Sequence, residues 1–262
     1  MMKPESRRKA DEAVTRFLAA LQFLTIIVIP WRREVQAGEL ERSAGYFPII
    51  GLIIGLLLVG LNLLFGLLLP PMLVAALLVA FLVIISGAIH LDGFADTCDG
   101  LVNHKTVEER WQVMHDSRAG AFGIVGIVLL LLLKYVALTS IPEASKIMAL
   151  ILMPVISRWT MVYALFASPY ARPSGLGKAF KQGTTWPRFT MATIIAVAVA
   201  AIIAQLIGLA ILFLVWVVAV AAAAYFKSKF SGLTGDNYGA INEVAEVSVL
   251  ILITILARFG LA

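Results

Sequence analysis

Long apolar runs recur along this chain, and they constrain its fold more strongly than any other feature. Hydrophobic residues make up 61% of the 262 residues, and charged residues make up 14%. The apolar runs fall at about residues 46–69, 72–90, 121–141, 147–167, 189–207, 209–226 and 244–261. A helix of about 20 apolar residues can cross the hydrocarbon core of a bilayer, so we predict an all-α, polytopic transmembrane helical bundle of about seven spans. We expect residues 1–262 to form a single integral membrane domain.

Two local features refine this prediction. The piece from 189 to 226 is too long for one span, so we expect a tight turn near "QLIG", where Gln205 and Gly208 lie. The "GLIIG" at 51–55 has two glycines four positions apart, a spacing typical of helices that pack closely in membranes.

Residues 1–45 form a basic N-terminal segment that we expect in the cytoplasm. The segment contains an apolar stretch at 14–29 that is short for a span. This stretch ends at Pro30-Trp31-Arg32-Arg33 without the small-residue cleavage site of a signal peptide. We therefore predict an uncleaved helix over 14–29 that lies in the membrane interface or enters the membrane partway.

Lysines and arginines concentrate in alternate loops. Residues 1–45 carry eight of them, and the stretches 91–120, 168–188 and 227–243 carry most of the others. With seven spans these segments fall on one face, and positive residues favour the cytoplasmic face. We therefore expect a protein integral to the cytoplasmic membrane. The net charge of +5 is explained by these loops and requires no nucleic acid partner.

The stretch "HLDGFADTCDG" at 90–100 places three aspartates directly after an apolar run. At about 100° per residue, Asp92, Asp96 and Asp99 share a narrow stripe of a helix. Asn103 falls on the same stripe. Carboxylates this close repel one another, and their charge is costly to desolvate near a membrane. A divalent cation removes both penalties, and oxygen ligands suit Mg²⁺, Ca²⁺ or Mn²⁺. The alternative is a solvated helix end, where acids are harmless.

A second polar island, "HDSRAGAFG", follows at 115–123. Asp116 adds a fourth carboxylate to the candidate metal ligands, and Arg118 offers a planar fork that suits phosphate. His115 is a candidate proton acceptor. A simple helix cap with packing glycines is the alternative. Together the two islands make residues 90–120 the candidate catalytic region at the cytoplasmic face.

Polar residues farther along the chain are also candidates. Arg158 lies in the middle of an apolar run, where a charge needs a partner. We expect it to bind phosphate or to form a structural ion pair with one of the aspartates. Asp236 and Glu243, in "SGLTGDNYGAINEVAE", could bind cation, phosphate or sugar hydroxyls, although an ordinary turn has the same spacing. Arg172 lies in "YARPSGLGK", which lacks the GxxxxGK[ST] pattern of a Walker A loop.

Seven motifs occur in order along almost the whole chain: "ALQFLTIIVIP", "YFPIIGLIIG", "HLDGFADTCDGL", "MHDSRAGAFG", "SRWTMV", "YARPSGLG" and "GLTGDNYGA". They resemble the motifs of the cobalamin synthase family, the adenosylcobinamide-GDP ribazoletransferases. The resemblance implies an enzyme of the bacterial cytoplasmic (inner) membrane with its active site facing the cytoplasm. It implies Mg²⁺-dependent joining of adenosylcobinamide-GDP to α-ribazole, or to its 5′-phosphate, with release of GMP. The products are adenosylcobalamin or its 5′-phosphate.

This resemblance gives the candidate residues specific roles. One or two Mg²⁺ ions bind against the diphosphate, and one aspartate or His115 takes the proton from the ribose 5′-hydroxyl. The predicted metal ligands, also counted as catalytic, are Asp92, Asp96, Asp99 and Asp116. The predicted substrate-binding residues are Asn103, Arg118, Arg158, Arg172, Asp236 and Glu243.

Three other functions remain open from the residues. A cation-coupled transporter also has acids among its spans, but it predicts acids near the bilayer midplane and two similar halves. A CDP-alcohol-type phosphotransferase acting on a lipid alcohol would share the aspartates. A non-catalytic scaffold predicts that alanine at the aspartates has no effect. A homo-oligomer, or contacts with other cobalamin-pathway enzymes, is likewise left open.

Overall fold

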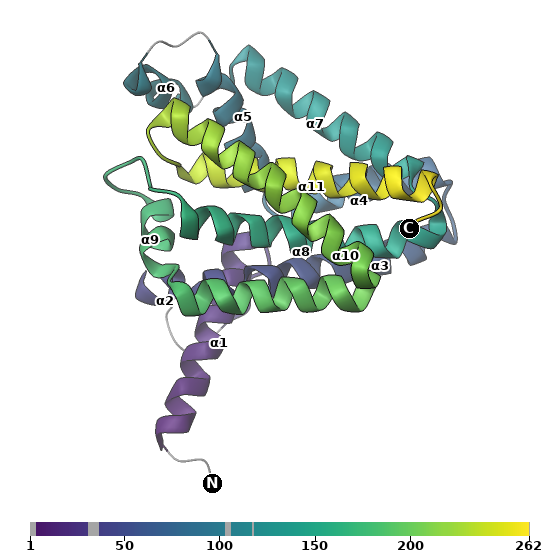
Figure 1. The fold of residues 1–262 in the computed structure, drawn as a ribbon, viewed down its shortest axis with the longest axis horizontal. Coiled ribbons are helices and arrows are strands. Elements are labelled where there is room, and N and C mark those ends of the chain that lie inside the picture. Colours follow the sequence, from purple (N-terminus) through teal and green to yellow (C-terminus); the bar gives the residue numbers. More distant parts are fainter. Residues whose placement is uncertain (1–3, 31–36, 103–105, 117, 262) are drawn as a thin grey trace.

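The computed structural model describes residues 4–30, 37–102, 106–116 and 118–261. The described residues are almost entirely helical, and they contain no β-sheet, so the all-α prediction is confirmed (Figure 1). The helices are α1 Pro4–Leu24, α2 Ala37–Glu41, the 3₁₀ turn η1 Ser43–Tyr46, α3 Phe47–Gly66, α4 Pro71–Ile85, α5 Ile89–Leu101, α6 Val107–Met114, α7 Ala121–Ser140, α8 Glu143–Ala167, α9 Leu176–Gly183, α10 Trp186–Phe230 and α11 Gly235–Arg258.

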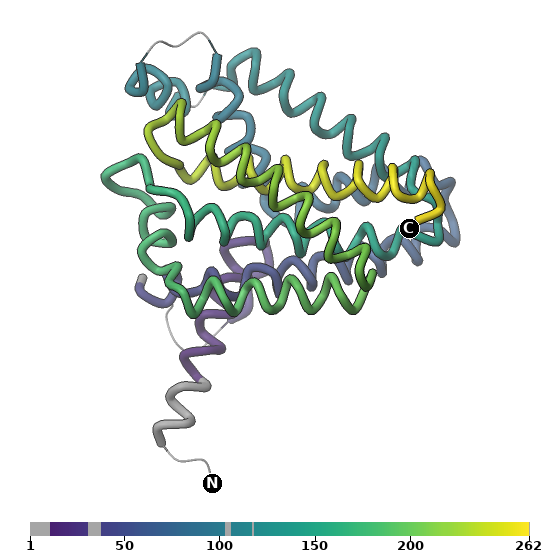
Figure 2. The backbone as a smooth tube through the Cα atoms, viewed as in Figure 1, coloured from purple at the N-terminus to yellow at the C-terminus, as the bar shows by residue number. Residues whose placement is uncertain are grey.

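Several of these helices are long and apolar enough to cross a membrane. Among the described residues, η1 with α3, α7, α8, α10 and α11 pass this test singly, and α4 with α5 passes it as a bent pair. The 45-residue α10 leaves helical geometry at Ala204 and Gln205, where Figure 2 shows the tube turning back toward the end it came from. The predicted turn near "QLIG" is therefore confirmed. The molecule is a polytopic membrane-embedded bundle, and the number of spans stays a prediction.

The predicted apolar segment 72–90 is not one straight helix. Helix α4 ends at Ile85, and the chain bends by 88° before α5 begins at Ile89. Gly87 and Ala88 both have positive φ, which ends an α-helix because its residues need negative φ. The bend was not visible in the sequence, because the apolar run continues through it as far as Ile89.

The N-terminal helix also differs from the predicted 14–29. Helix α1 begins at Pro4 and ends at Leu24, and the backbone N–H of Ile26 then donates to the Ile85 carbonyl at 2.8 Å. Figure 2 shows α1 leaving the bundle at a steep angle to its long helices. Its depth in a membrane stays a prediction.

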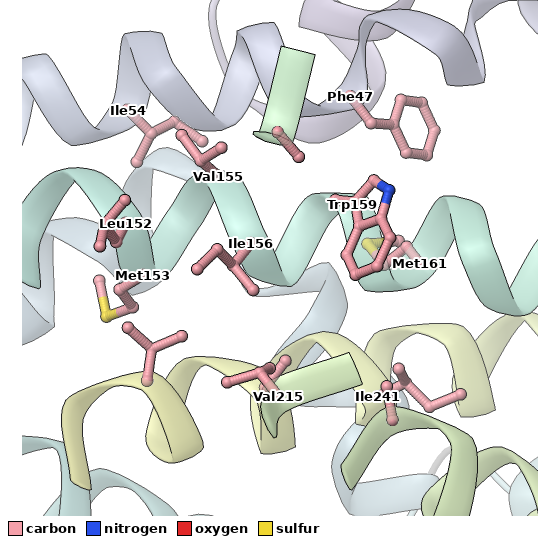
Figure 3. Packing of buried hydrophobic residues seen from close by; sticks show 14 of the residues in the cluster. Phe47, Ile54, Leu152, Met153, Val155, Ile156, Trp159, Met161, Val215 and Ile241 are labelled. Carbon is pink, nitrogen blue, oxygen red and sulfur yellow. The ribbon is translucent and has the colours of Figure 1, made fainter. Parts of the chain in front are cut away.

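Helix α8 is the central helix of the bundle. Of its most apolar 18-residue window, 89% is buried inside the protein. The glycines of "GLIIG" let α3 pack directly on it, since a Cβ on Gly55 would lie 2.9 Å from the Ile151 Cα, and one on Gly51 would overlap the Pro154 carbonyl. The predicted close helix contact is confirmed. Figure 3 shows α8 side chains between those of α3, such as Ile54, and those of α11, such as Ile241.

Candidate active site

Helix α5 crosses the beginning of α11 at a very short distance. A Cβ on Gly93 would lie 2.8 Å from the carbonyl oxygen of Asp236. A Cβ on Gly239 would lie 3.1 Å from the Cα of His90. Only glycine lets two backbones approach this closely without a shift. The crossing therefore brings the aspartates of α5 beside Asp236, which lies far away in the sequence.

The beginning of α11 is fixed by a capping box. The Thr234 hydroxyl accepts a hydrogen bond from the Asn237 backbone N–H at 3.3 Å, and the Asn237 side-chain oxygen accepts one from the Thr234 N–H at 3.0 Å. Asn237 also donates through Nδ2 to the Thr97 hydroxyl of α5 at 3.0 Å. These buried bonds hold the first turn of α11 against α5 in one register.

Four carboxylates lie near this crossing and act on one another electrostatically. Asp92, Asp96 and Asp99 all lie on helix α5, as the spacing predicted; Asp92 is exposed, and the other two are half-buried. The charges that act on Asp96 are those of Asp92, Asp236 and Asp99, opposed by Arg172. We call Asp92, Asp96, Asp99 and Asp236 the carboxylate cluster. The cluster has four carboxylates, and the nearby cation Arg172 compensates only one negative charge.

Asp99 has a second role within the cluster. Its carboxylate accepts hydrogen bonds from the backbone N–H of Gly120 at 2.9 Å and of Gly123 at 2.8 Å. These N–H groups belong to the first turn of α7, which has no partner for them inside the helix. Asp99 therefore caps α7 from a neighbouring helix. Its predicted role as a metal ligand competes with this capping role for the same carboxylate oxygens.

Asp116 and Arg118, two predicted site residues, form a pair with each other. Both are exposed, and Arg118 donates to Asp116 through its backbone N–H, Nε and Nη2 at 3.0, 3.0 and 2.8 Å. Hydrogen bonds from the Arg118 side chain, and then from its backbone, lower the pKa of the Asp116 carboxyl to about 2. The two predicted site residues thus pair with each other. Asn103 lies outside the described residues.

A cavity of about 1060 Å³ lies beside the carboxylate cluster. Asp236, Arg172 and His115 are the sequence-predicted residues that line it. Its walls come from α1, α3, α5, α6, α8, α9, α11 and the loop after α8. Six aromatic side chains contribute to them: Phe23, Phe47, Trp111, Tyr170, Phe180 and Tyr238. A cavity with apolar walls and a few polar groups is typical of small-molecule sites.

Arg172 reaches the cluster because two loops are bonded together. The backbone N–H of Ala171 donates to the Leu233 carbonyl at 2.9 Å, and the Leu233 N–H donates to the Pro169 carbonyl at 2.9 Å. Arg172 then donates through Nη2 to Asp236 at 3.2 Å. The guanidinium therefore stands at the cavity wall, next to the carboxylates.

Two predicted substrate-binding residues lie elsewhere. Arg158 pairs with Glu246, and Glu243 pairs with Lys134, which also contacts Glu246. All four side chains are buried between α7, α8 and α11, and none lines the cavity. The ion-pair interpretation of Arg158 is therefore favoured, but its partner is the glutamate Glu246 and not, as predicted, one of the aspartates. Lys134 was missed, although a lysine inside the apolar run 121–141 is the same signal that singled out Arg158.

Within the described residues, no three acidic, histidine or cysteine side chains lie close enough together to hold a metal ion. The donor chemistry of the cluster nevertheless fits Mg²⁺, because it consists of carboxylate oxygens with an excess of negative charge. Asp99 and Asp236 already accept hydrogen bonds from other groups. Asp92 and Asp96 accept none from the described part of the chain, so they are the best candidates for metal ligands.

Comparison with known proteins agrees with the motifs. The family model described as cobalamin-5-phosphate synthase matches residues 16–254. The chain is 39% identical over 244 residues to the adenosylcobinamide-GDP ribazoletransferase of Geotalea daltonii, which covers 93% of this chain and 98% of that protein. It is 34% identical over 242 residues to the enzyme of that name from Thermoanaerobacter pseudethanolicus, at 92% and 97% coverage. No solved structure matches the chain.

Proposed function

The chain belongs to the cobalamin-5-phosphate synthase family, and we propose that it joins adenosylcobinamide-GDP to α-ribazole, or to α-ribazole 5′-phosphate, with release of GMP. The observation that carries this proposal is the carboxylate cluster at the edge of a large cavity. Arg172 connects the two, because it lines the cavity and contacts Asp236 of the cluster. The reaction needs a site that holds a diphosphate beside a nucleoside, and this arrangement offers both parts.

The transfer is a displacement at phosphorus. The acceptor attacks through a ribose hydroxyl other than the expected 5′-hydroxyl, because the 5′-oxygen of α-ribazole 5′-phosphate is already esterified. This hydroxyl loses its proton and forms a bond to the phosphorus next to cobinamide, the bond from that phosphorus to the bridging oxygen breaks, and GMP leaves with the bonding electrons. The protein's tasks in such a reaction are alignment and neutralisation of charge. Arg172 binds a diphosphate oxygen, since its guanidinium lines the cavity. His115, which also lines the cavity, or an aspartate of the cluster accepts the hydroxyl proton.

We propose Mg²⁺ as the cofactor, held by Asp92 and Asp96 with Asp236 beside them. Bound there, the ion would neutralise charge on the diphosphate, which the carboxylates alone would repel. Asp99 supports the site mainly by fixing α5 to α7. The Asp116–Arg118 pair lies outside the metal site in this proposal.

We propose the bacterial cytoplasmic (inner) membrane as the location, with the site facing the cytoplasm. Figure 1 supports this, because α2, α5, α6, α9 and the turn between α10 and α11 gather at one end of the bundle. The stretches 91–120, 168–188 and 227–243, which contain α6, α9 and this turn, carry nine of the 13 lysines and arginines outside residues 1–45. The cavity lies at the same end.

The test is GMP release by purified protein in detergent, given adenosylcobinamide-GDP and α-ribazole with Mg²⁺ or with EDTA. We expect GMP to appear only when both substrates and Mg²⁺ are present, together with a product of the mass of adenosylcobalamin. α-Ribazole 5′-phosphate in a parallel reaction identifies the preferred acceptor. If the folded protein releases no GMP but acts as a CDP-alcohol-type phosphotransferase on a lipid alcohol, the proposed function is wrong.

A further inference from the structure

The cavity wall contains polar atoms that the protein buries without giving them hydrogen bonds. Four such atoms, without a partner among the described residues, belong to side chains that line it: His90 Nε2, Trp111 Nε1, Arg172 Nε and Tyr238 Oη. A buried polar atom left unsatisfied lowers stability, and most native proteins avoid it. Atoms of this kind that gather in one cavity indicate a ligand that completes their hydrogen bonds.

Two of these residues are positioned by the α5–α11 crossing. His90 and Tyr238 are 2% and 3% exposed, so bulk water does not satisfy them. His90 lies against Gly239, the residue after Tyr238. The two side chains therefore come from the same rigid junction that assembles the carboxylate cluster, and a ligand held by them lies next to that cluster.

The rest of the wall is aromatic. The ring centroids of Phe23 and Phe180 lie 4.5 Å apart, and those of Phe47 and Phe180 lie 5.6 Å apart. Tyr170 and Tyr238 stack with their planes 17° apart. Aromatic faces favour flat, unsaturated rings over flexible or strongly charged groups. The wall therefore suits a planar ring system with few polar atoms.

We propose that this cavity binds the nucleoside substrate, with its fused aromatic base against these rings and with Tyr238 Oη and His90 Nε2 hydrogen-bonded to its polar atoms. This inference rests on the proposed function and narrows it. A benzimidazole nucleoside has one free ring nitrogen, which accepts a hydrogen bond, and ribose hydroxyls that donate and accept. A tyrosine hydroxyl and a neutral imidazole match this set, since each can donate or accept.

The size of the cavity admits the nucleoside. Its volume of about 1060 Å³ is at the upper end of cavities that enclose a small molecule. A corrin ring with its amide side chains and its nucleotide is several times larger than a nucleoside. A nucleoside therefore fills only part of the cavity, and the remaining volume is left for the diphosphate of the second substrate beside Asp236.

The test is calorimetric binding of α-ribazole to the full chain, without metal and without the second substrate. Tyr238→Phe removes a hydroxyl that makes no hydrogen bond in the described protein, so it should leave the unfolding temperature unchanged. It should weaken α-ribazole binding about three- to tenfold, the effect of one lost hydrogen bond. Tyr163→Phe is the matched control, because Tyr163 packs against Trp159 and Trp216 away from the cavity, and its affinity should equal the wild type's.

Trp111→Phe serves as a second variant, and GMP release is measured for each protein. In both variants the lost hydrogen bond to α-ribazole should raise the KM for α-ribazole with little change in kcat. If the wild type releases GMP but Tyr238→Phe and Trp111→Phe both bind α-ribazole as tightly as it does, the inference is wrong and the proposed function stands. If the wild type neither binds α-ribazole nor releases GMP, the proposed function fails and the inference fails with it.

Discussion

The carboxylate of Asp99 accepts a hydrogen bond from the backbone N–H of Gly123 at 2.8 Å, so a side chain of α5 caps α7. The same carboxylate accepts from Gly120, the other glycine of "RAGAFG" that faces it. A Cβ on either glycine would overlap the Asp99 carboxylate. The two polar islands of the sequence are thus parts of one junction.

Gly123→Ala should therefore destabilise the protein. The added methyl group displaces Asp99 and removes hydrogen bonds from the first turn of α7, at a cost of about 1–3 kcal/mol for overpacking. Gly60→Ala is the matched control, because a Cβ there meets nothing within 4 Å. Alanine in a helix interior favours folding by roughly 0.5–1 kcal/mol, so the control should gain stability. Thermal unfolding in detergent measures both, and equal unfolding temperatures would contradict the capping role.

Lys134→Met should be among the most damaging single changes in the bundle. It removes one cation from the buried group of Lys134, Arg158, Glu243 and Glu246 and leaves a carboxylate without compensation. Breaking a buried ion pair in this way costs about 3–5 kcal/mol. Adding Glu243→Gln restores charge balance, so the double variant should be more stable than Lys134→Met alone. Chemical unfolding of the three proteins in the same detergent tests this, and additive losses would argue against a coupled network.

Arg172→Gln should lower transferase activity more than stability. The guanidinium lines the cavity and contacts Asp236, so its loss removes a charge-assisted contact to phosphate. We expect GMP release to fall by about 10- to 100-fold, as for loss of roughly 1.4–2.7 kcal/mol of transition-state binding. Lys227→Gln, an exposed cation outside the cavity, should keep the wild-type rate. A wild-type rate in Arg172→Gln would remove it from the site.

Much of this architecture could be predicted from local sequence patterns. The stripe of Asp92, Asp96 and Asp99 follows from helical periodicity, and two glycines at fixed spacing predict that α3 packs closely on another helix, although not that this helix is α8. The bend between α4 and α5 could not be predicted in this way, because the apolar run continues through it. Its cause is backbone geometry at Gly87 and Ala88.

The composition of the site was only partly predictable. Asp236 joins the cluster through a tertiary crossing, and Tyr238 and Trp111 carry no chemical signal of their own in the sequence. Glu243 looked like a site residue because it is an acid near glycines, but its partner is Lys134 on another helix. Residue type identified the candidates, and only the packing of α5, α7, α8 and α11 separated cavity residues from buried ion pairs.

The decisive measurement is the rate of GMP release by Asp96→Asn at saturating substrates and Mg²⁺, beside the wild type and Asp11→Asn. Asp96 is half-buried within the carboxylate cluster, whereas Asp11 is exposed on α1. If the cluster holds the metal, Asp96→Asn should lose at least about a hundredfold in rate, and Asp11→Asn should lose nothing. A folded Asp96→Asn that releases GMP at the wild-type rate, still dependent on Mg²⁺, would place the metal elsewhere and contradict the proposed site.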